Sequence, residues 1–265
     1  IVSLVITCLI ALWFFRTKIK AALLEVASKQ ISFERILSYS WPLSVAGMIT
    51  ILLGRIDYIF LGMFRPSADV GTYRIFYTLI AVLSLGISSL AKIYRPVVSE
   101  LISSDNKEKL TSTYQRIAKW YIAITFLGFL IIFFLGEELL LILFTQAYVA
   151  APLALFVLAS NHLMNAFTGP DGMTLKAFGN TKLNMINIAL MLVTNAGLDY
   201  LLIPSYGILG AAIGTAAGTI INHLAGLIEV WWIHDLHPFS LNQVRYFTAA
   251  TVTGLSYYLL SLIVP

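Results

Sequence analysis

Long apolar runs follow one another through almost the whole chain, and they constrain its fold more than any other feature. A helix needs about 20 mainly apolar residues to cross the hydrocarbon core of a bilayer, which is about 30 Å thick. Hydrophobic residues make up 59% of the sequence and charged residues 11%, whereas a soluble domain carries about 25% charged residues. The sequence therefore predicts an all-α polytopic membrane protein.

The runs predict about eight transmembrane helices. Their approximate ranges are 1–15, 36–63, 72–95, 119–136, 150–169, 181–203, 207–233 and 244–264. The first run starts at Ile1, so we interpret it as a helix that is incomplete in this sequence. The longest polar interval, 97–118, is too short for a soluble domain, and we interpret it as a loop or a short interfacial helix.

Most of the 17 Lys and Arg residues fall on one side when successive loops are assigned alternately to the two sides of the membrane. Loops rich in Lys and Arg tend to remain cytoplasmic. The loops that hold Lys18 and Lys107 are therefore expected in the cytoplasm, and the turn at 204–207 is expected on the outer side. The formal charge of +4 then reflects membrane topology, and we predict no nucleic-acid partner.

The segment 18–35, KIKAALLEVASKQISFER, mixes charged and apolar residues. Such a pattern suits an amphipathic helix that lies in the membrane interface. We interpret 16–35 as a cytoplasmic linker between two membrane halves, with an ordinary loop as the alternative.

Motifs for cofactors and catalysis are missing from the sequence. Cys8 is the only cysteine, which excludes a disulfide framework and a multi-thiolate metal site within the chain. The phosphate-loop, dinucleotide-binding and H-E-x-x-H patterns are also absent. We therefore predict no cofactor, no metal site and no catalytic residue.

Two ionisable residues fall inside the run 36–63, where such groups are costly and indicate function. Arg55 and Asp57 are two positions apart, so on a helix they point in directions about 200° apart. Asp57 is expected to line a cavity or to pair with another helix, and Arg74 is a candidate partner. Arg55 either serves a cavity or extends its charge to the outer interface.

Further polar residues occur in the later runs. In SNHLMNAF, Asn161 and Asn165 share one helix face, with His162 beside it. His162 and His223 are interpreted as hydrogen-bond partners between helices, because a zinc site would need three or four such ligands together. Glu229 lies near the inner interface and is interpreted mainly as a helix-pairing residue, with proton transfer as the alternative.

Small residues recur every four positions near the end of the chain, which predicts a helix face that allows close approach of another helix. They are Gly210, Gly214, Gly218, Asn222 and Gly226. Asn195 and Asp199 are also four apart, on the preceding predicted helix. The segment 204–207 is predicted to form the tight turn between the two helices.

Several stretches together resemble the polysaccharide-biosynthesis flippases of the multidrug/oligosaccharidyl-lipid/polysaccharide exporter superfamily. They are NAGLDYLLIPSYGILGAAIGTAAG, YSWPLSVAGMITILLGRIDYIFLGMF, VGTYRIFYTL, YRPVVSEL and LFTQAYVAAPLALFVLA. They follow the family's order across roughly 36–225. Thr145 and Gln146 depart from the family pattern, and so does Asp199, where a second asparagine is common.

The resemblance implies a MATE-like fold of two six-helix bundles around a central cavity. The run 1–15 would then be the last helix of the first bundle, 36–235 the second transmembrane bundle, and 236–265 an additional C-terminal transmembrane helix.

The function implied is the flipping of a lipid-linked oligosaccharide across the cell (plasma) membrane by alternating access. Sugar hydroxyls and phosphate would need amide, imidazole and guanidinium donors. The residues expected to bind substrate are Arg55, Asn161, Asn165, Asn195 and Asn222. Those expected to serve coupling or helix pairing are Asp57, Arg74 and Asp199. Expected partners are the lipid-linked oligosaccharide, membrane lipids and polysaccharide-assembly proteins.

The sequence leaves three alternative functions open. A multidrug/cation antiporter of the same superfamily would favour acidic over basic cavity residues. A membrane-embedded O-acyltransferase would use Asn195 and His223 together, and a structural scaffold would need neither a substrate nor a coupling site.

Overall fold

The computed structural model describes residues 33–149 and 151–239. The long helices are α3 (Phe33–Phe64), α4 (Ser67–Ser103), α5 (Lys107–Leu143), α8 (Thr181–Tyr206) and α9 (Ile208–His234). Shorter elements are the 3-10 helix η2 (Gln146–Tyr148), α6 (Pro152–Thr168) and α7 (Asp171–Ala177). The predicted runs 1–15 and 244–264 and most of the linker 16–35 lie outside the described residues.

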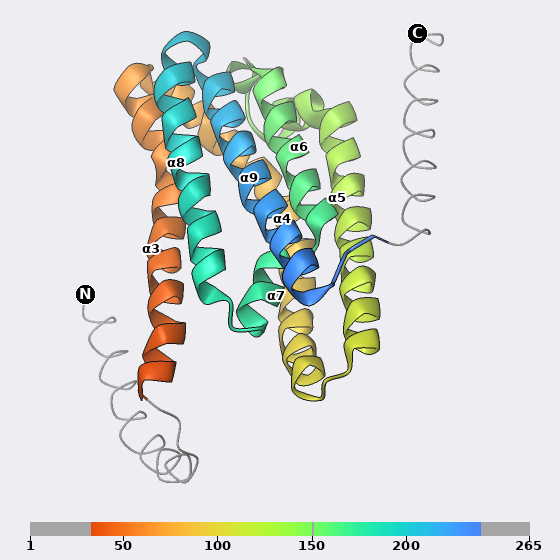
Figure 1. Ribbon diagram of the computed structural model, residues 1–265. Helices are drawn as coiled ribbons and strands as arrows, with labels where there is room; N and C mark the ends of the chain where they lie inside the picture. Colours follow the sequence, from red (N-terminus) through yellow and green to blue (C-terminus); the bar gives the residue numbers. More distant parts are fainter. Residues whose placement is uncertain (1–32, 150, 240–265) are drawn as a thin grey trace, which may run out of the picture. The chain divides into compact units, whose positions relative to one another are not determined.

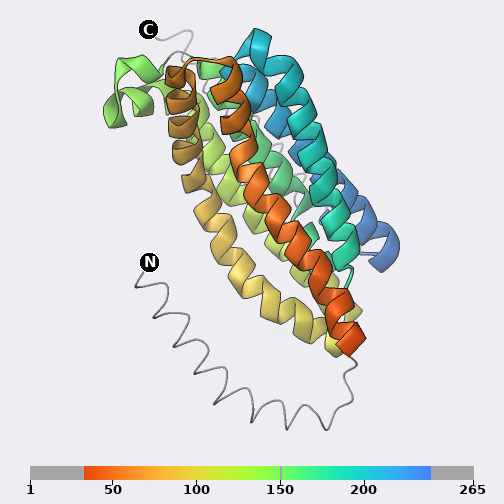
Figure 2. The ribbon, with the colours of Figure 1, turned by 90° about the vertical axis from the view of Figure 1, so that its left-hand side faces the viewer.

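Four of the described helices are long and apolar enough to cross a membrane, namely α3, α5, α8 and α9. Helix α4 adds a fifth span if its two segments, which meet at 47°, are taken together. Figure 2 shows this bend as a change of direction partway along α4. Helix α6 has 17 residues, the lower end of the length that spans a bilayer. The all-helical membrane class is thus confirmed, and the described residues account for four or five spans of the predicted eight.

The prediction that 97–118 is a loop or a short interfacial helix is wrong, because almost all of it belongs to the long helices α4 and α5. Helix α4 continues to Ser103 and α5 begins at Lys107, so only a three-residue turn separates them. Asn106 caps α5 by accepting a hydrogen bond of 3.1 Å from the Lys109 amide. Leu101 and Leu110 are buried, so both helix ends are amphipathic, and their charged faces produced the polar interval in the sequence.

Helix α9 packs against α8 and α6, and Figure 1 shows it between them. The glycines of α9 make the contact with α8 close. A Cβ atom at Gly210 would lie 2.6 Å from the carbonyl carbon of Leu202, and one at Gly218 would lie 2.8 Å from the carbonyl oxygen of Met191. The predicted packing face is therefore confirmed.

The turn between α8 and α9 is shorter than predicted. Helix α8 includes Pro204 and runs to Tyr206, so Gly207 alone joins the two helices. Its φ of 56° lies in the left-handed region that glycine adopts without a steric penalty.

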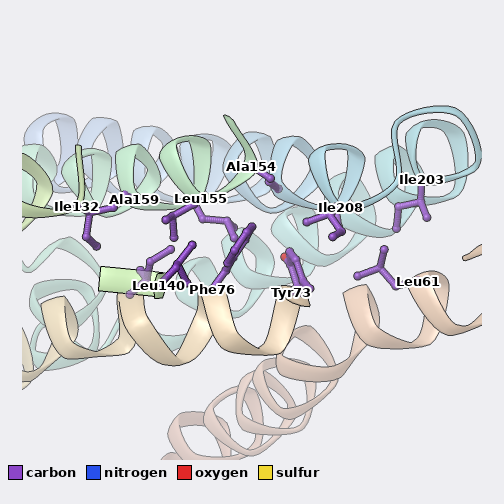
Figure 3. Packing of buried hydrophobic residues seen from close by; sticks show 14 residues of the cluster. Leu61, Tyr73, Phe76, Ile132, Leu140, Ala154, Leu155, Ala159, Ile203 and Ile208 are labelled. Carbon is purple, nitrogen blue, oxygen red and sulfur yellow. The ribbon is translucent and has the colours of Figure 1, made fainter. Parts of the chain in front are cut away.

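Two apolar cores stabilise opposite ends of the helices from α3 to α9. The first contains Leu61, Tyr73 and Phe76, which pack against Ile203 and Ile208, as Figure 3 shows. The second lies near the α4–α5 turn and contains Tyr94, Leu110, Tyr114, Leu175 and Val230. Each core adjoins a group of polar residues: Tyr73 of the first core donates a hydrogen bond to Asp57, and Leu175 of the second lines a polar cavity.

Candidate functional site

A buried polar cluster joins α3, α4, α8 and α9. We call it the Asp57 cluster, and its members are Asp57, Tyr73, Asn195, Asp199 and Thr215. Asp57 Oδ2 accepts hydrogen bonds from the Tyr73 hydroxyl at 2.6 Å and from the Thr215 hydroxyl at 2.8 Å. Asn195 Nδ2 donates to Thr215 Oγ1 at 3.2 Å. Residues far apart in the sequence thus share one hydrogen-bond network.

Several oxygens of the Asp57 cluster are buried without a hydrogen-bond partner in the part of the chain that the structure describes. They are Asp57 Oδ1, Asn195 Oδ1 and both carboxyl oxygens of Asp199. Asp199 has no exposed surface, and its carboxyl group interacts electrostatically with that of Asp57. Two ionised carboxylates placed together away from water repel each other and lose their hydration. Neutralising one of the two carboxyl groups with a proton or a small cation would reduce this cost.

Helix geometry and a glycine bring these oxygens together. Asn195 and Asp199 are one turn apart on α8, so both face α9. Opposite them, a Cβ atom at Gly214 would overlap Asp199 Oδ1 and would lie 3.2 Å from the carbonyl oxygen of Asn195. The glycine face of α9 therefore provides space for the Asp199 carboxyl group as well as for helix packing.

A second candidate site is a partly open cavity of about 220 Å³, which we call the Asp171 pocket. Side chains from α4, α5, α6, α7, α8 and α9 line it. The polar ones are Tyr121, Asn165, Asp171, Lys176, Asn184, Asn187, Asn222 and His223. Amide groups predominate in this set, and the pocket can both donate and accept hydrogen bonds.

Asp171 is held at the start of α7 by contacts with α9. Its carboxyl group lies 3.1 Å from His223 Nδ1, and its Oδ1 accepts a hydrogen bond of 2.7 Å from the Gly172 amide. A Cβ atom at Gly226 would lie 2.6 Å from Asp171 Oδ2. Gly226 therefore leaves room for the carboxylate beside α9, one turn from its imidazole partner.

The structure divides the predicted site residues between these two places. Asn195, Asp57 and Asp199 belong to the Asp57 cluster, and Asn165 and Asn222 line the Asp171 pocket.

Three predicted residues belong to neither site. Asn161 has a buried side-chain oxygen without a hydrogen-bond partner. Arg55 and Arg74 are exposed. Within the described helices Asp57 bonds to Tyr73 and Thr215 instead of the expected partner Arg74.

Sequence reasoning missed seven polar residues of the two sites, namely Tyr73, Tyr121, Asp171, Lys176, Asn184, Asn187 and Thr215. Tyr and Thr are ordinary residues in apolar helices, so nothing in the sequence marks Tyr73 or Thr215. Asp171 follows Gly169, the last residue of the predicted run 150–169, and Pro170. An acidic residue at such a helix break could have indicated a functional site. Within 33–149 and 151–239, no three His, Cys, Asp or Glu residues gather as a metal site would require.

A family model described as "Polysaccharide biosynthesis protein" matches residues 1–152. The chain is 25% identical over 166 residues to the probable low-salt glycan biosynthesis flippase Agl15 of Haloferax volcanii, a match covering 63% of this chain and 35% of that protein. It is 26% identical over 223 residues to the uncharacterized membrane protein MJ1068 of Methanocaldococcus jannaschii, covering 80% and 42%.

Solved structures show the same fold at low sequence identity. An outward-facing multidrug resistance MATE family transporter has a TM-score of 0.65 at 18% identity, covering 78% of this chain and 47% of that one. A MATE in the bent conformation has a TM-score of 0.64 at 16% identity, covering 86% and 54%. A MOP superfamily transporter from Pyrococcus furiosus has a TM-score of 0.59 at 18% identity, covering 84% and 52%.

The chain spans less than half the length of these curated relatives and about half of the solved structures. Its helices are MATE-like over that half. Because the family model matches more than half of the 265 residues, this chain belongs to the polysaccharide biosynthesis protein family of the MOP superfamily.

Proposed function

We propose that this chain forms the second bundle of a transporter that flips a lipid-linked oligosaccharide across the cell membrane by alternating access. The family match, the distant flippase relative and the likeness to half of a MATE-type transporter support this proposal. The residues 36–235 would form the second bundle, 16–35 the linker, and 1–15 and 236–265 the flanking helices. The α4–α5 turn would face the cytoplasm and Gly207 the outer side.

The observation that carries a transport mechanism is the set of unpartnered carboxyl oxygens in the Asp57 cluster. Burying such groups costs several kcal/mol each when nothing neutralises them. A fold retains that cost when occupancy changes during function. We therefore assign the cluster to coupling, with uptake and release of a proton or small cation driving the change between the two open states.

The donor atoms favour a hard cation or a proton over a transition metal. Carboxyl, amide and hydroxyl oxygens surround the site, and such oxygens suit hard cations, whereas transition metals prefer imidazole and thiolate ligands. The site also connects helices from both ends of the described chain. Binding there would tie α3 and α4 to α8 and α9, and release would loosen them.

The alternative functions differ in what these sites would do. A multidrug/cation antiporter would place its cationic substrate near Asp57 and Asp199. A transport assay that compares lipid flipping with efflux of a cationic dye distinguishes the two functions. An O-acyltransferase would need Asn195 and His223 together. Asn195 bonds to Thr215, and His223 lies eight residues further along α9, about 12 Å along its axis, so this alternative has no assembled site.

The test uses the complete transporter, this chain together with its first bundle, in proteoliposomes. A fluorescent polyprenyl-linked oligosaccharide reports flipping through its exposure to an impermeant quencher, with and without an imposed Na⁺ or H⁺ gradient. One of the two gradients should accelerate flipping, and Asp57→Asn and Asp199→Asn should each remove that acceleration. The matched control is Asp105→Asn, an exposed turn residue with a φ of 53° that asparagine also adopts.

Two results would contradict the proposal. An unchanged gradient response in both cluster variants would remove the cluster from coupling. Efflux of a cationic dye in place of lipid flipping would establish the antiporter instead.

A further inference from the structure

We propose that the Asp171 pocket binds a neutral sugar ring of the transported glycan, and that this subsite is separate from the site that binds the phosphate. This inference deepens the proposed function and rests on it for the identity of the cargo. The pocket and its hydrogen-bonding groups are observed independently of the Asp57 cluster. Three of its properties indicate the ligand.

The first property is an unsatisfied hydroxyl. Tyr121 lines the pocket and is 1% exposed, and its buried hydroxyl has no hydrogen-bond partner among the described residues. Buried polar groups almost always have a partner, and a phenol can both donate and accept. A ligand hydroxyl entering the pocket would satisfy Tyr121.

The second property is the balance of charge around the pocket. Asp171 contributes a carboxylate, which is paired with His223 at 3.1 Å, and Lys176 contributes a cation. The remaining polar lining groups are uncharged amides and the Tyr121 phenol, and none of the arginines among the described residues lines the pocket. The opposite charges of Asp171 and Lys176 offset each other, so the pocket offers no excess charge to a pyrophosphate or to a cationic drug. A pyrophosphate would also lack a bidentate guanidinium partner there.

The third property is size combined with mixed walls. The volume of about 220 Å³ exceeds what a bare cation needs, and it is below the roughly 300–1,000 Å³ typical of drug-sized ligands. Ile87 and Ile188 form an apolar part of the pocket wall, against which the C–H face of a pyranose can pack. Asn165 and Asn222 lie among the polar groups, where their amides can bind vicinal hydroxyls as donor and acceptor.

The experiment measures binding by the purified complete transporter in nanodiscs with saturation-transfer difference NMR. The probes are the methyl pyranosides of glucose, galactose, mannose and N-acetylglucosamine, with inorganic pyrophosphate as competitor. At least one glycoside should bind saturably, and pyrophosphate should not displace it. Tyr121→Phe, which removes one hydrogen bond, should weaken that binding about 3- to 10-fold.

Matched variants separate local contacts from general damage. Tyr200→Phe alters an exposed tyrosine on α8 and should leave glycoside binding unchanged. Asp171→Asn should weaken binding about tenfold or more, because a charged acceptor is lost. If this variant does not fold, the comparison of Tyr121→Phe with Tyr200→Phe still decides the proposal.

The proposal is overturned if none of the four glycosides binds, if pyrophosphate displaces them, or if Tyr121→Phe binds them as tightly as the unaltered protein. Flipping without glycoside binding would reject the sugar subsite and leave the proposed function standing. Glycoside binding without flipping would support the subsite and reject the proposed function.

Discussion

The hydroxyl of Tyr73 on α4 donates a 2.6 Å hydrogen bond to Asp57 Oδ2 on α3, and both residues are almost fully buried. Tyr73 also belongs to the apolar core that Figure 3 shows. One side chain therefore ties the Asp57 carboxylate to the packing of α4 against α6 and α9. A change at Tyr73 tests both roles.

Tyr73→Phe should keep the core packed and remove one hydrogen bond from Asp57. The expected loss of stability is about 1–3 kcal/mol. The rate of flipping under an imposed ion gradient should fall more than the rate of flipping without a gradient. Thermal unfolding in detergent and the proteoliposome assay measure the two effects. Tyr200→Phe serves as control, and equal behaviour of the two variants would show that the bond to Asp57 contributes nothing.

Gly214→Ala should disturb the Asp57 cluster, because the added Cβ atom would overlap the Asp199 carboxyl group. Gly197→Ala is the matched control, since it lies on α8 with nothing within 4 Å of its would-be Cβ atom. We expect gradient coupling to be lost in the first variant and retained in the second. If Gly214→Ala flips lipid normally under a gradient, the close approach at this position is not needed for coupling.

Lys107→Ala should leave thermal stability unchanged within error. Lys107 Nζ lies 2.9 Å from Asp235 Oδ2, but both side chains are largely exposed, and exposed ion pairs contribute little. The ammonium group of Lys107 holds the pKa of Asp235 below its usual value. What stability the pair contributes is therefore present at neutral pH and lost as the pH falls through that lowered pKa. Unfolding curves at neutral and acidic pH check this, and a clear drop for the variant at neutral pH would contradict it.

The α4–α5 turn and Gly207 are expected to lie on opposite sides of the membrane. Ser103→Cys, beside the α4–α5 turn, should react only from the cytoplasm, and Ser205→Cys, beside Gly207, only from outside. Both are made in a Cys8→Ala background and probed in whole cells with an impermeant maleimide before and after permeabilisation. Labelling of both positions from the same side would reverse or abolish the proposed topology.

Arg55 remains a predicted substrate-binding residue. If it meets a phosphate, Arg55→Ala should abolish flipping, and Arg55→Lys should restore only part of it because lysine lacks the bidentate geometry. Arg74→Ala, another exposed arginine, shows whether positive charge alone matters. Full activity of Arg55→Ala in the proteoliposome assay would remove this residue from the substrate path.

The sequence predicted the apolar lengths of the helices and missed the amphipathic ends of two of them. The run 181–203 anticipates α8 and 207–233 anticipates α9 within a few residues, because length and hydrophobicity determine membrane spans. The ends of α4 and α5 were missed because Leu101 and Leu110 are scattered among charged residues.

The candidate sites were predictable only in part for a related reason. The four-residue spacing of Asn195 and Asp199 indicates a shared helix face within one element. Their neighbour Thr215 lies 158 positions from Asp57, and a hydrogen bond across that separation depends on how α9 is placed beside α3. Periodicity within one helix carries no information about that placement.

Gly207 is the whole connection between α8 and α9, and this makes the length of the chain there unusually critical. Adding one residue would turn all of α9 by about 100° and advance it by about 1.5 Å. Thr215 would then point away from Asp57, and the glycines would no longer oppose Asp199 and Met191. Insertions should therefore be far better tolerated at the exposed three-residue turn 104–106 than at this joint, although both are short connections at the ends of long helices.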